Sequence, residues 1–309
     1  MWLTSFLMDG TMDALLWIPV VALAFAVPLY LPRWRLRRAL ARPLPQAGVA
    51  ILERNIPVYA SMGEALRLQL QQLVKQFLHQ KKFVGCEGLE VDDEMRYTIA
   101  GQACLLLLNR PSKVYRALHT ILVYPSAFLV PRKQLDAGGV VTDHHQTLLG
   151  ESWEDGRVVL SWADVKRGYR DWTDGHNVVL HEFAHQLDSE SGSTNGAPYL
   201  GSKDSYRSWS AVLSRDYDNL RFDAYYGRQD SVLDHYGATS PAEFFAVATE
   251  TFFEKPWQMA ERHAALYQEF SKYYRVDPRQ WLAAPAPPEP LAIPAQMPGR
   301  GASYAFASW

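Results

Sequence analysis

Apolar residues recur at helical spacing in two parts of this chain. Between residues 61 and 82 they fall three or four positions apart, which is the spacing of one helix face, and Ser61 and Glu64 have the form of a capping box at the start. A nearly continuous apolar run at residues 99–108 predicts a buried helix that ends before Pro111. Both segments are predicted to pack into a core.

Two shorter segments, residues 121–124 and 157–162, are rich in β-branched residues and predict strands. Helices mixed with short strands over residues 57–282 predict an α+β domain. Proline and glycine in residues 32–56, which also carry several arginines, predict a linker before this domain. Six prolines among alanines at residues 283–309 predict a disordered tail.

An uncharged apolar run at residues 14–31 is close to the shortest length that crosses a bilayer as a helix. The preceding segment, residues 1–13, carries only acidic charges, whereas four arginines follow the run at residues 33–38. Because positive charge stays on the cytoplasmic side, this asymmetry predicts one transmembrane helix in the inner membrane, with its N-terminus outside and the domain in the cytoplasm. The alternative is a soluble cytoplasmic protein whose apolar segment is covered by a partner or lies at an interface.

Composition narrows the class of protein. A chain of 309 residues with 48% hydrophobic and 21% charged residues is an ordinary globular protein with a sizeable core. Its net charge of −2 gives no argument for a nucleic-acid partner. The only two cysteines, Cys86 and Cys104, form no CxxC pair, so neither a disulfide scaffold nor a thiolate metal site is indicated.

A third predicted helix, at residues 178–187, is mostly apolar but carries two histidines and a glutamate. His181 and His185 are four positions apart and therefore project from one face, one turn apart. Two imidazoles placed in this way can share a zinc ion, which takes three protein ligands in catalytic sites. Glu182 lies beside the first histidine and can act as a general base toward a water molecule. The pattern predicts a hydrolytic metal centre.

The third ligand is expected on a helix that begins at Pro241. Glu243 and Glu250 are seven positions apart and lie on similar faces of this helix. Ser240 and Glu243 also have capping-box spacing, which offers Glu243 a purely structural role. Glu250 lies among aromatic residues, where an unpaired carboxylate would be costly. Spacing alone does not choose between the two glutamates.

Two sequences taken together, HEFAHQLD at residues 181–188 and YGATSPAEFFAVATE at residues 236–250, resemble the Mlc titration factor A family of zinc metallopeptidases. The resemblance extends over about residues 57–281. The same two motifs are more distantly similar to the catalytic domain of anthrax lethal factor. Both resemblances imply a zincin-like fold, with the HExxH helix beside a short mixed sheet.

The family resemblance also implies roles for individual residues. One zinc ion per chain would be held by His181, His185 and Glu243, with Glu182 as the general base. Tyr236, seven residues before the third ligand, would assist the transition state.

Two further expectations are less specific to the family. Asp188 has two interpretations, as an acceptor that orients a ligand histidine or as a helix-terminating residue. The segment Val158–Trp162 precedes the HExxH helix and is predicted to be an edge strand that pairs with the substrate backbone.

The resemblance implies an enzyme that hydrolyses peptides, with aminopeptidase activity, although the motif chemistry equally permits endopeptidase activity. A second hypothesis is a regulatory protein that sequesters a transcriptional repressor of the Mlc type, because the family is named for that property. The expected partners are therefore a peptide or protein substrate, a repressor of this type and the membrane, with no direct contact to nucleic acid.

Overall fold

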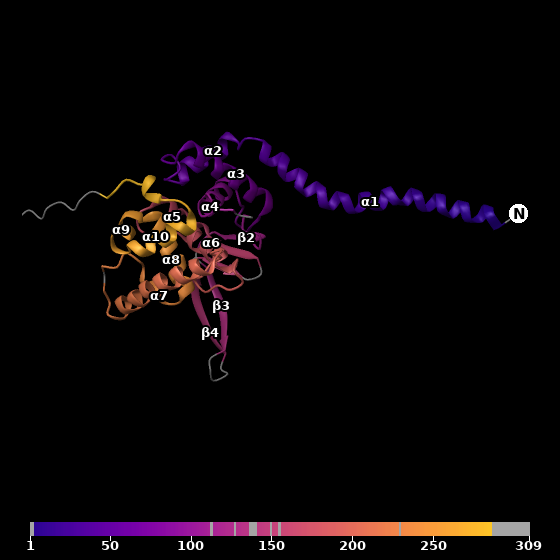
Figure 1. The fold of residues 1–309 in the computed structure, drawn as a ribbon. Helices are drawn as coiled ribbons and strands as arrows, with labels where there is room; N and C mark the ends of the chain where they lie inside the picture. The colour runs from indigo at the N-terminus through magenta and orange to yellow at the C-terminus, as the bar shows by residue number, and fades with distance from the viewer. Residues whose placement is uncertain are drawn as a thin grey trace, which may run out of the picture.

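A long N-terminal helix, α1 (Leu3–Ala41), projects from a body of shorter helices packed around a small sheet (Figure 1). This computed structural model describes residues 3–111, 114–126, 128–135, 141–148, 150–153, 156–228 and 230–285. Nearly all of the predicted tail, residues 283–309, lies outside the described residues.

Helix α1 includes the apolar run at residues 14–31 for which a membrane span is predicted. Over the part of the chain that the structure describes, no helix combines the length and the apolar character needed to cross a bilayer. The predicted transmembrane helix is therefore without structural support, and the cellular location stays a prediction.

The segment expected to be a linker, residues 32–56, is largely helical. It contains the end of α1 and all of α2 (Gln46–Asn55). The two helices are separated by residues 42–45, where Pro43 follows the end of α1 and Pro45 is the N-cap of α2. Leu52 of α2 is fully buried, and its side chain packs close to the backbone of Gly101. This segment therefore belongs to the folded body.

Helix α3 (Glu64–Gln80) follows the predicted amphipathic pattern but begins later than expected. Its N-cap is Gly63, and no side chain caps its first turn. Ser61 instead donates its backbone N–H to the carbonyl of Val58 in a preceding turn, so the predicted capping box does not form. The apolar run at residues 99–108 forms most of α4 (Asp93–Leu105), which is buried as predicted.

The central sheet has four strands in the order β1-β2-β6-β5. The strands are β1 (Lys82–Gly85), β2 (Thr120–Tyr124), β6 (Arg157–Ser161) and β5 (Gly150–Trp153). The first three run parallel, and β5 is antiparallel to β6. A separate hairpin is formed by β3 (Phe128–Leu135) and β4 (Val141–Leu148) and extends away from the body in Figure 1. The two predicted strands correspond to β2 and β6.

The remaining helices complete the body. They are α5 (Trp162–Arg170), α6 (Val178–Ser189), α7 (Lys203–Tyr225), η1 (His235–Ala238), α8 (Pro241–Glu254), α9 (Pro256–Arg262), α10 (Ala264–Tyr274) and η2 (Pro278–Gln280). Helices α6 and α8 are in extensive contact with each other. The fold is mostly helical with a small sheet, which agrees with the predicted mixed architecture.

The prediction that residues 158–162 form an edge strand is wrong. Strand β6 lies between two partners, with Val158 opposite Ile121 of β2 and Ser152 of β5. Its backbone groups are therefore used on both sides and have none left for a substrate. The edge of the sheet on that side is β5, which contacts α6.

Candidate metal centre

The start of α6 is fixed by its N-cap residue. The Asn177 side chain accepts hydrogen bonds from the backbone N–H groups of Val179 and Leu180, at 3.1 and 3.0 Å. The apolar side chains of α6 are buried, namely Val179, Leu180, Phe183, Ala184 and Leu187. Because these side chains anchor the helix on its other faces, His181 and His185 are presented together toward α8.

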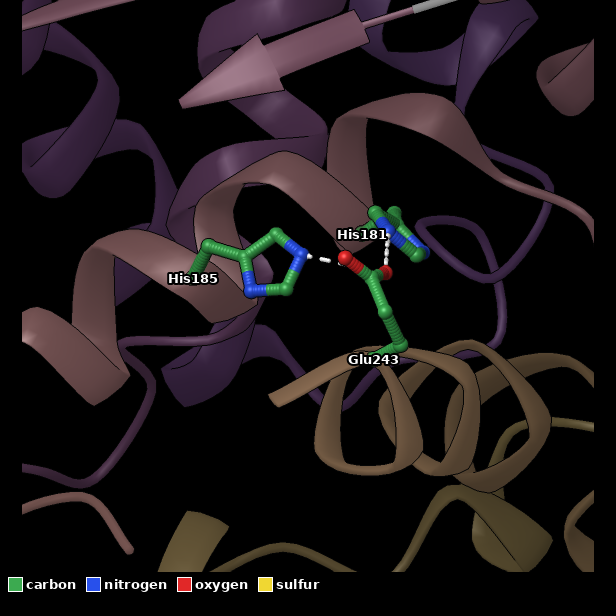
Figure 2. Close-up of side chains that lie close together, drawn as sticks. All are labelled: His181, His185 and Glu243. Atoms are coloured by element: carbon green, nitrogen blue, oxygen red, sulfur yellow. Dashed lines mark hydrogen bonds and ion pairs between the residues drawn. The ribbon is translucent and has the colours of Figure 1, made fainter. Parts of the chain in front are cut away.

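Glu243, the predicted third metal ligand, lies at the start of α8. The Ser240 hydroxyl accepts the backbone N–H of Glu243 at 3.2 Å, which is one half of a capping box. The Glu243 carboxylate does not return to Ser240. It points across to α6 and lies between the two histidines (Figure 2).

The three side chains converge within the range of one metal ion. Glu243 Oε2 lies 3.0 Å from His181 Nε2 and 3.4 Å from His185 Nε2, and the ligand atoms of all three lie within 4.8 Å of one another. Ligand atoms bound at 2.0–2.1 Å around a tetrahedral zinc are roughly 3.3 Å apart. The nitrogen and carboxylate donor set and its spacing therefore fit zinc.

The charged side chains of this group shift one another's pKa values. Burial opposes protonation of His181, but the carboxylates of Glu250 and Glu243 outweigh it and hold the His181 pKa well above its ordinary value. Burial raises the pKa of Glu243. Hydrogen bonds from the two histidines lower it by a larger amount, so the pKa of Glu243 lies below its ordinary value. A bound cation would replace protons here, which makes metal affinity dependent on pH.

Glu182 lies beside the ligand group and is only 5% exposed. Burial raises its pKa to about 7, although the neighbouring histidines oppose the shift. Its Oε2 is buried and, among the described residues, has no hydrogen-bond partner. An unpaired buried carboxylate oxygen next to a group of metal donors is what a water-activating base requires.

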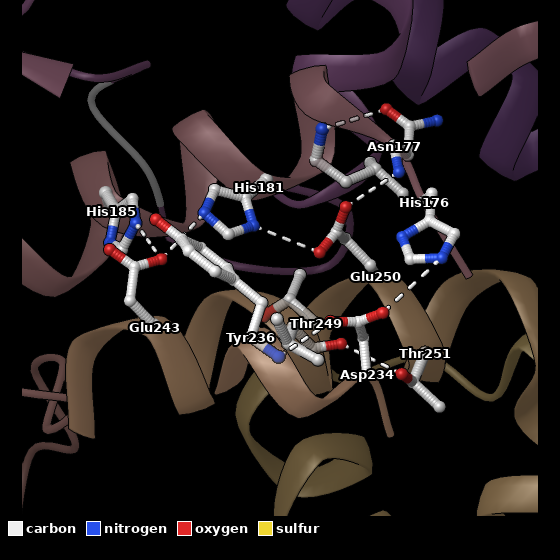
Figure 3. A network of polar contacts seen from close by, with 12 residues as sticks. His176, Asn177, His181, His185, Asp234, Tyr236, Glu243, Thr249, Glu250 and Thr251 are labelled. Carbon is white, nitrogen blue, oxygen red and sulfur yellow. Dashed lines mark hydrogen bonds and ion pairs between the residues drawn. The ribbon is translucent and has the colours of Figure 1, made fainter. Parts of the chain in front are cut away.

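Glu250, the alternative third ligand, contacts the far side of His181 (Figure 3). Its Oε2 lies 3.0 Å from His181 Nδ1, and its Oε1 accepts the backbone N–H of Asn177 at 2.7 Å. Since an ionised carboxylate only accepts, His181 donates from Nδ1 and turns Nε2 toward Glu243. Carboxylates commonly orient metal-binding histidines in this way. Sequence reasoning noted Glu250 but missed this role.

Glu254, one turn further along α8, also contacts the start of α6. Its Oε1 accepts a hydrogen bond from the Asn177 side chain at 3.0 Å. Burial raises the pKa of Glu254 well above its ordinary value, and the nearby charge of Glu250 adds to this shift. The neutral form is therefore favoured at this position.

Asp188 is fully buried at the end of α6. Its Oδ2 accepts the backbone N–H of Gly196 at 2.6 Å, and within the described part of the chain neither histidine donates a hydrogen bond to it. Gly196 lies against the start of α8, so close that a side chain there would meet the carbonyl of Pro241. The contact with Asp188 therefore holds the loop that follows α6 against α8. The proposed role of Asp188 as a histidine acceptor stays a prediction.

Tyr236 lies in η1, just before α8. Its backbone N–H donates a hydrogen bond to Asp234 Oδ1 at 2.7 Å. Its ring centroid is 6.0 Å from that of His181. Figure 3 shows the phenol ring extending toward the two histidines and Glu243. The side chain is 47% exposed, so it lies where a bound substrate can reach it.

An HExxH helix facing a second helix that supplies a carboxylate defines the class of metal-dependent peptidases. Comparison with known families agrees with this class. The model for the glucose-regulated metallo-peptidase M90 family matches residues 31–275, and the chain belongs to this family.

Individual relatives cover most of the chain. An uncharacterized protein of Synechocystis sp. is 41% identical over 260 residues, which are 84% of this chain and 94% of that protein. The Mlc titration factor A proteins of Yersinia pestis and Yersinia pseudotuberculosis are each 33% identical over 265 residues, which are 83% of this chain and 96% of theirs. The resemblance to the Mlc titration factor A family is confirmed, whereas the resemblance to lethal factor stays a prediction.

Proposed function

We propose that this chain is a zinc-dependent peptidase whose ion is held by His181, His185 and Glu243. The observation that carries the proposal is the approach of Glu243 Oε2 to the Nε2 atoms of His181 and His185, at 3.0 and 3.4 Å. Beside them lies the buried Oε2 of Glu182, which has no hydrogen-bond partner among the described residues. Membership of a metallopeptidase family supports the reaction class.

Each protein group has a distinct role in the proposed hydrolysis. Zinc, when bound, supplies a Lewis acid that polarises the peptide carbonyl and lowers the pKa of water. Glu182 accepts a proton from the attacking water and returns it to the departing amine. Glu182 is suited to this role because its Oε2 is buried and has no hydrogen-bond partner among the described residues. The Tyr236 hydroxyl donates a hydrogen bond to the carbonyl oxygen as negative charge develops there.

The substrate backbone is proposed to pair with β5. This strand contacts α6 and pairs with β6 on one side only, within the described part of the chain. An extended peptide can therefore add to its outer edge and pass in front of the HExxH helix.

Aminopeptidase activity is the expected specificity, on the basis of the family resemblance. Peptides with a free N-terminus should be cleaved, whereas the same peptides with an acetylated N-terminus should not. Equal cleavage of both forms would identify an endopeptidase and leave the zinc mechanism intact.

The test of the mechanism is Glu182→Gln, which keeps the shape of the side chain and removes its basic oxygen. Hydrolysis should be lost while about one zinc per chain is retained, as measured by elemental analysis. Unchanged hydrolysis in this variant would refute the role given to Glu182.

A second proposed function is binding of a transcriptional repressor of the Mlc type. It rests on the name of the relatives from Yersinia. The Glu182→Gln variant separates the two functions, because an independent binding role should survive the loss of hydrolysis. Loss of repressor binding in the same variant would argue against an independent role.

A further inference from the structure

Asn177, the residue before α6, has a hydrogen bond at each of its four polar groups and is only 1% exposed. Its side-chain oxygen accepts the backbone N–H groups of Val179 and Leu180. Its backbone carbonyl accepts the backbone N–H of His181 at 2.9 Å. These bonds fix the first turn of α6 and, with it, the backbone of the first candidate ligand.

The two other polar groups of Asn177 bond to α8. The backbone N–H donates to Glu250 Oε1 at 2.7 Å, and the side-chain Nδ2 donates to Glu254 Oε1 at 3.0 Å. The two glutamates are four positions apart and therefore lie one turn apart on one face of α8. Two bonds placed one turn apart restrict both the rotation of α8 about its axis and its shift along α6.

The same contacts include the side chain of His181. Glu250 accepts from the backbone of Asn177 with one oxygen and lies 3.0 Å from His181 Nδ1 with the other, and Figure 3 shows it between the two residues. Glu243 belongs to the same helix, about two turns before Glu250, and lies 3.0 Å from His181 Nε2. The placement of α8 against Asn177 therefore also sets the approach of Glu243 to the imidazole.

Neighbouring packing holds the amide of Asn177 in place. A Cβ at Gly168 of α5 would lie 3.2 Å from Asn177 Cγ and 3.3 Å from its Nδ2, so the backbone of α5 packs directly against this side chain. An amide meets both requirements here, because its oxygen accepts at the start of α6 and its nitrogen donates to α8. Serine and aspartate also cap helices, but serine is shorter and an ionised aspartate only accepts.

We propose that Asn177 is a positioning residue for the metal centre and acts by holding α8 against the start of α6 through Glu250 and Glu254. The inference rests on the proposed zinc site, because it concerns how Glu243 is brought to the two histidines. Its effect on zinc is indirect, since Asn177 acts through the packing of two helices.

The experiment compares the zinc affinity of the full-length wild type and Asn177→Ser, by competition against a chromophoric chelator. Serine keeps an N-cap for α6, but its hydroxyl lies nearer the backbone and does not reach Glu254. Zinc affinity should fall about tenfold, as when a group that orients a metal ligand is removed. Equal affinity in the two proteins would overturn the proposal and leave the zinc site intact, whereas absence of zinc from the wild type would refute the site as well.

Asn55→Ser is the matched control for a general loss of stability. Asn55 is also 1% exposed, and its Nδ2 donates to Glu94 Oε1 at 3.2 Å, between the end of α2 and the start of α4. Both serine variants lose a buried amide that donates to a glutamate, so the Tm of the metal-free protein should fall in both. Zinc affinity should fall only in Asn177→Ser. An equal loss of zinc affinity in both variants would overturn the proposal.

Exchange of the two partners tests the bond itself. In the double variant Asn177→Asp with Glu254→Gln, the carboxylate still accepts at the start of α6, and the glutamine amide donates to it. The bond between α6 and α8 is then kept with donor and acceptor reversed. Zinc affinity should match that of the wild type. An affinity as low as that of Asn177→Ser would contradict the role of this bond and overturn the proposal.

Discussion

Replacement of Glu250 by glutamine tests whether this carboxylate orients His181. In the wild type, one oxygen lies 3.0 Å from His181 Nδ1 and the other accepts the backbone N–H of Asn177 at 2.7 Å. Glutamine has one oxygen and one amide nitrogen in these places. It can therefore accept from only one of the two donors, and its NH₂ group faces the other.

The size of the effect follows from which donor loses its acceptor. If the amide oxygen faces Asn177, His181 loses the group that fixes its tautomer, and zinc affinity should fall about 10–100-fold, or roughly 1.4–2.7 kcal/mol. If the oxygen faces His181 instead, the buried N–H at Asn177 is unpaired and folding should lose about 1–3 kcal/mol. Each kcal/mol lowers Tm by roughly 2–4 °C in a domain of this size.

The assay is zinc competition against a chromophoric chelator, with thermal unfolding of the metal-free protein in parallel. Glu254→Gln is the matched control, because Glu254 also bonds to Asn177 but is not in contact with a candidate ligand. The control should keep the zinc affinity of the wild type. Glu243→Ala should lose zinc altogether.

Unchanged zinc affinity together with an unchanged Tm in Glu250→Gln would refute this role. A different result would change which glutamate is assigned as the third metal ligand. If Glu250→Ala loses the zinc and Glu243→Ala keeps it, Glu250 is the third ligand and the match to the family motif fails.

Three other changes give sharp expectations. Tyr236→Phe should lower kcat for peptide hydrolysis by about 10²–10³ with zinc content unchanged, and full activity would exclude a role in the transition state. Gly196→Ala should lower stability by about 1–3 kcal/mol in thermal unfolding, because φ is +79° there and a Cβ would lie 2.4 Å from the Pro241 carbonyl oxygen; an unchanged Tm would contradict this. Folding raises the pKa of Glu254, so wild-type stability should fall as pH rises above the ordinary glutamate value of about 4.3. Glu254→Gln cannot ionise and should therefore unfold at a higher temperature than the wild type at pH 8, by a margin that shrinks at pH 5; an equal margin at both would contradict the shift.

Much of the fold could be read from local pattern, and the exceptions have physical causes. The amphipathic segment of α3, the buried run of α4 and the strands β2 and β6 are predicted because each has its own apolar spacing. Strands β1 (KFVG) and β5 (GESW) each contain a glycine and at most one β-branched residue, so their sequences carry no strand signal. The position of β6 inside the sheet depends on β5, which is why its edge assignment failed.

The sequence by itself determined the pair of histidines, since a separation of four residues on a helix places His181 and His185 on one face wherever the helix packs. Spacing does not separate Glu243 from Glu250, because both lie on similar faces of α8, and the family resemblance implies Glu243 without a physical reason. Only the tertiary structure supplies that reason. Helix α8 passes α6 so that Glu243 meets His181 at Nε2 and Glu250 meets the same ring at Nδ1. One carboxylate thus joins the candidate ligand set and the other orients it, and this difference exists only between packed helices.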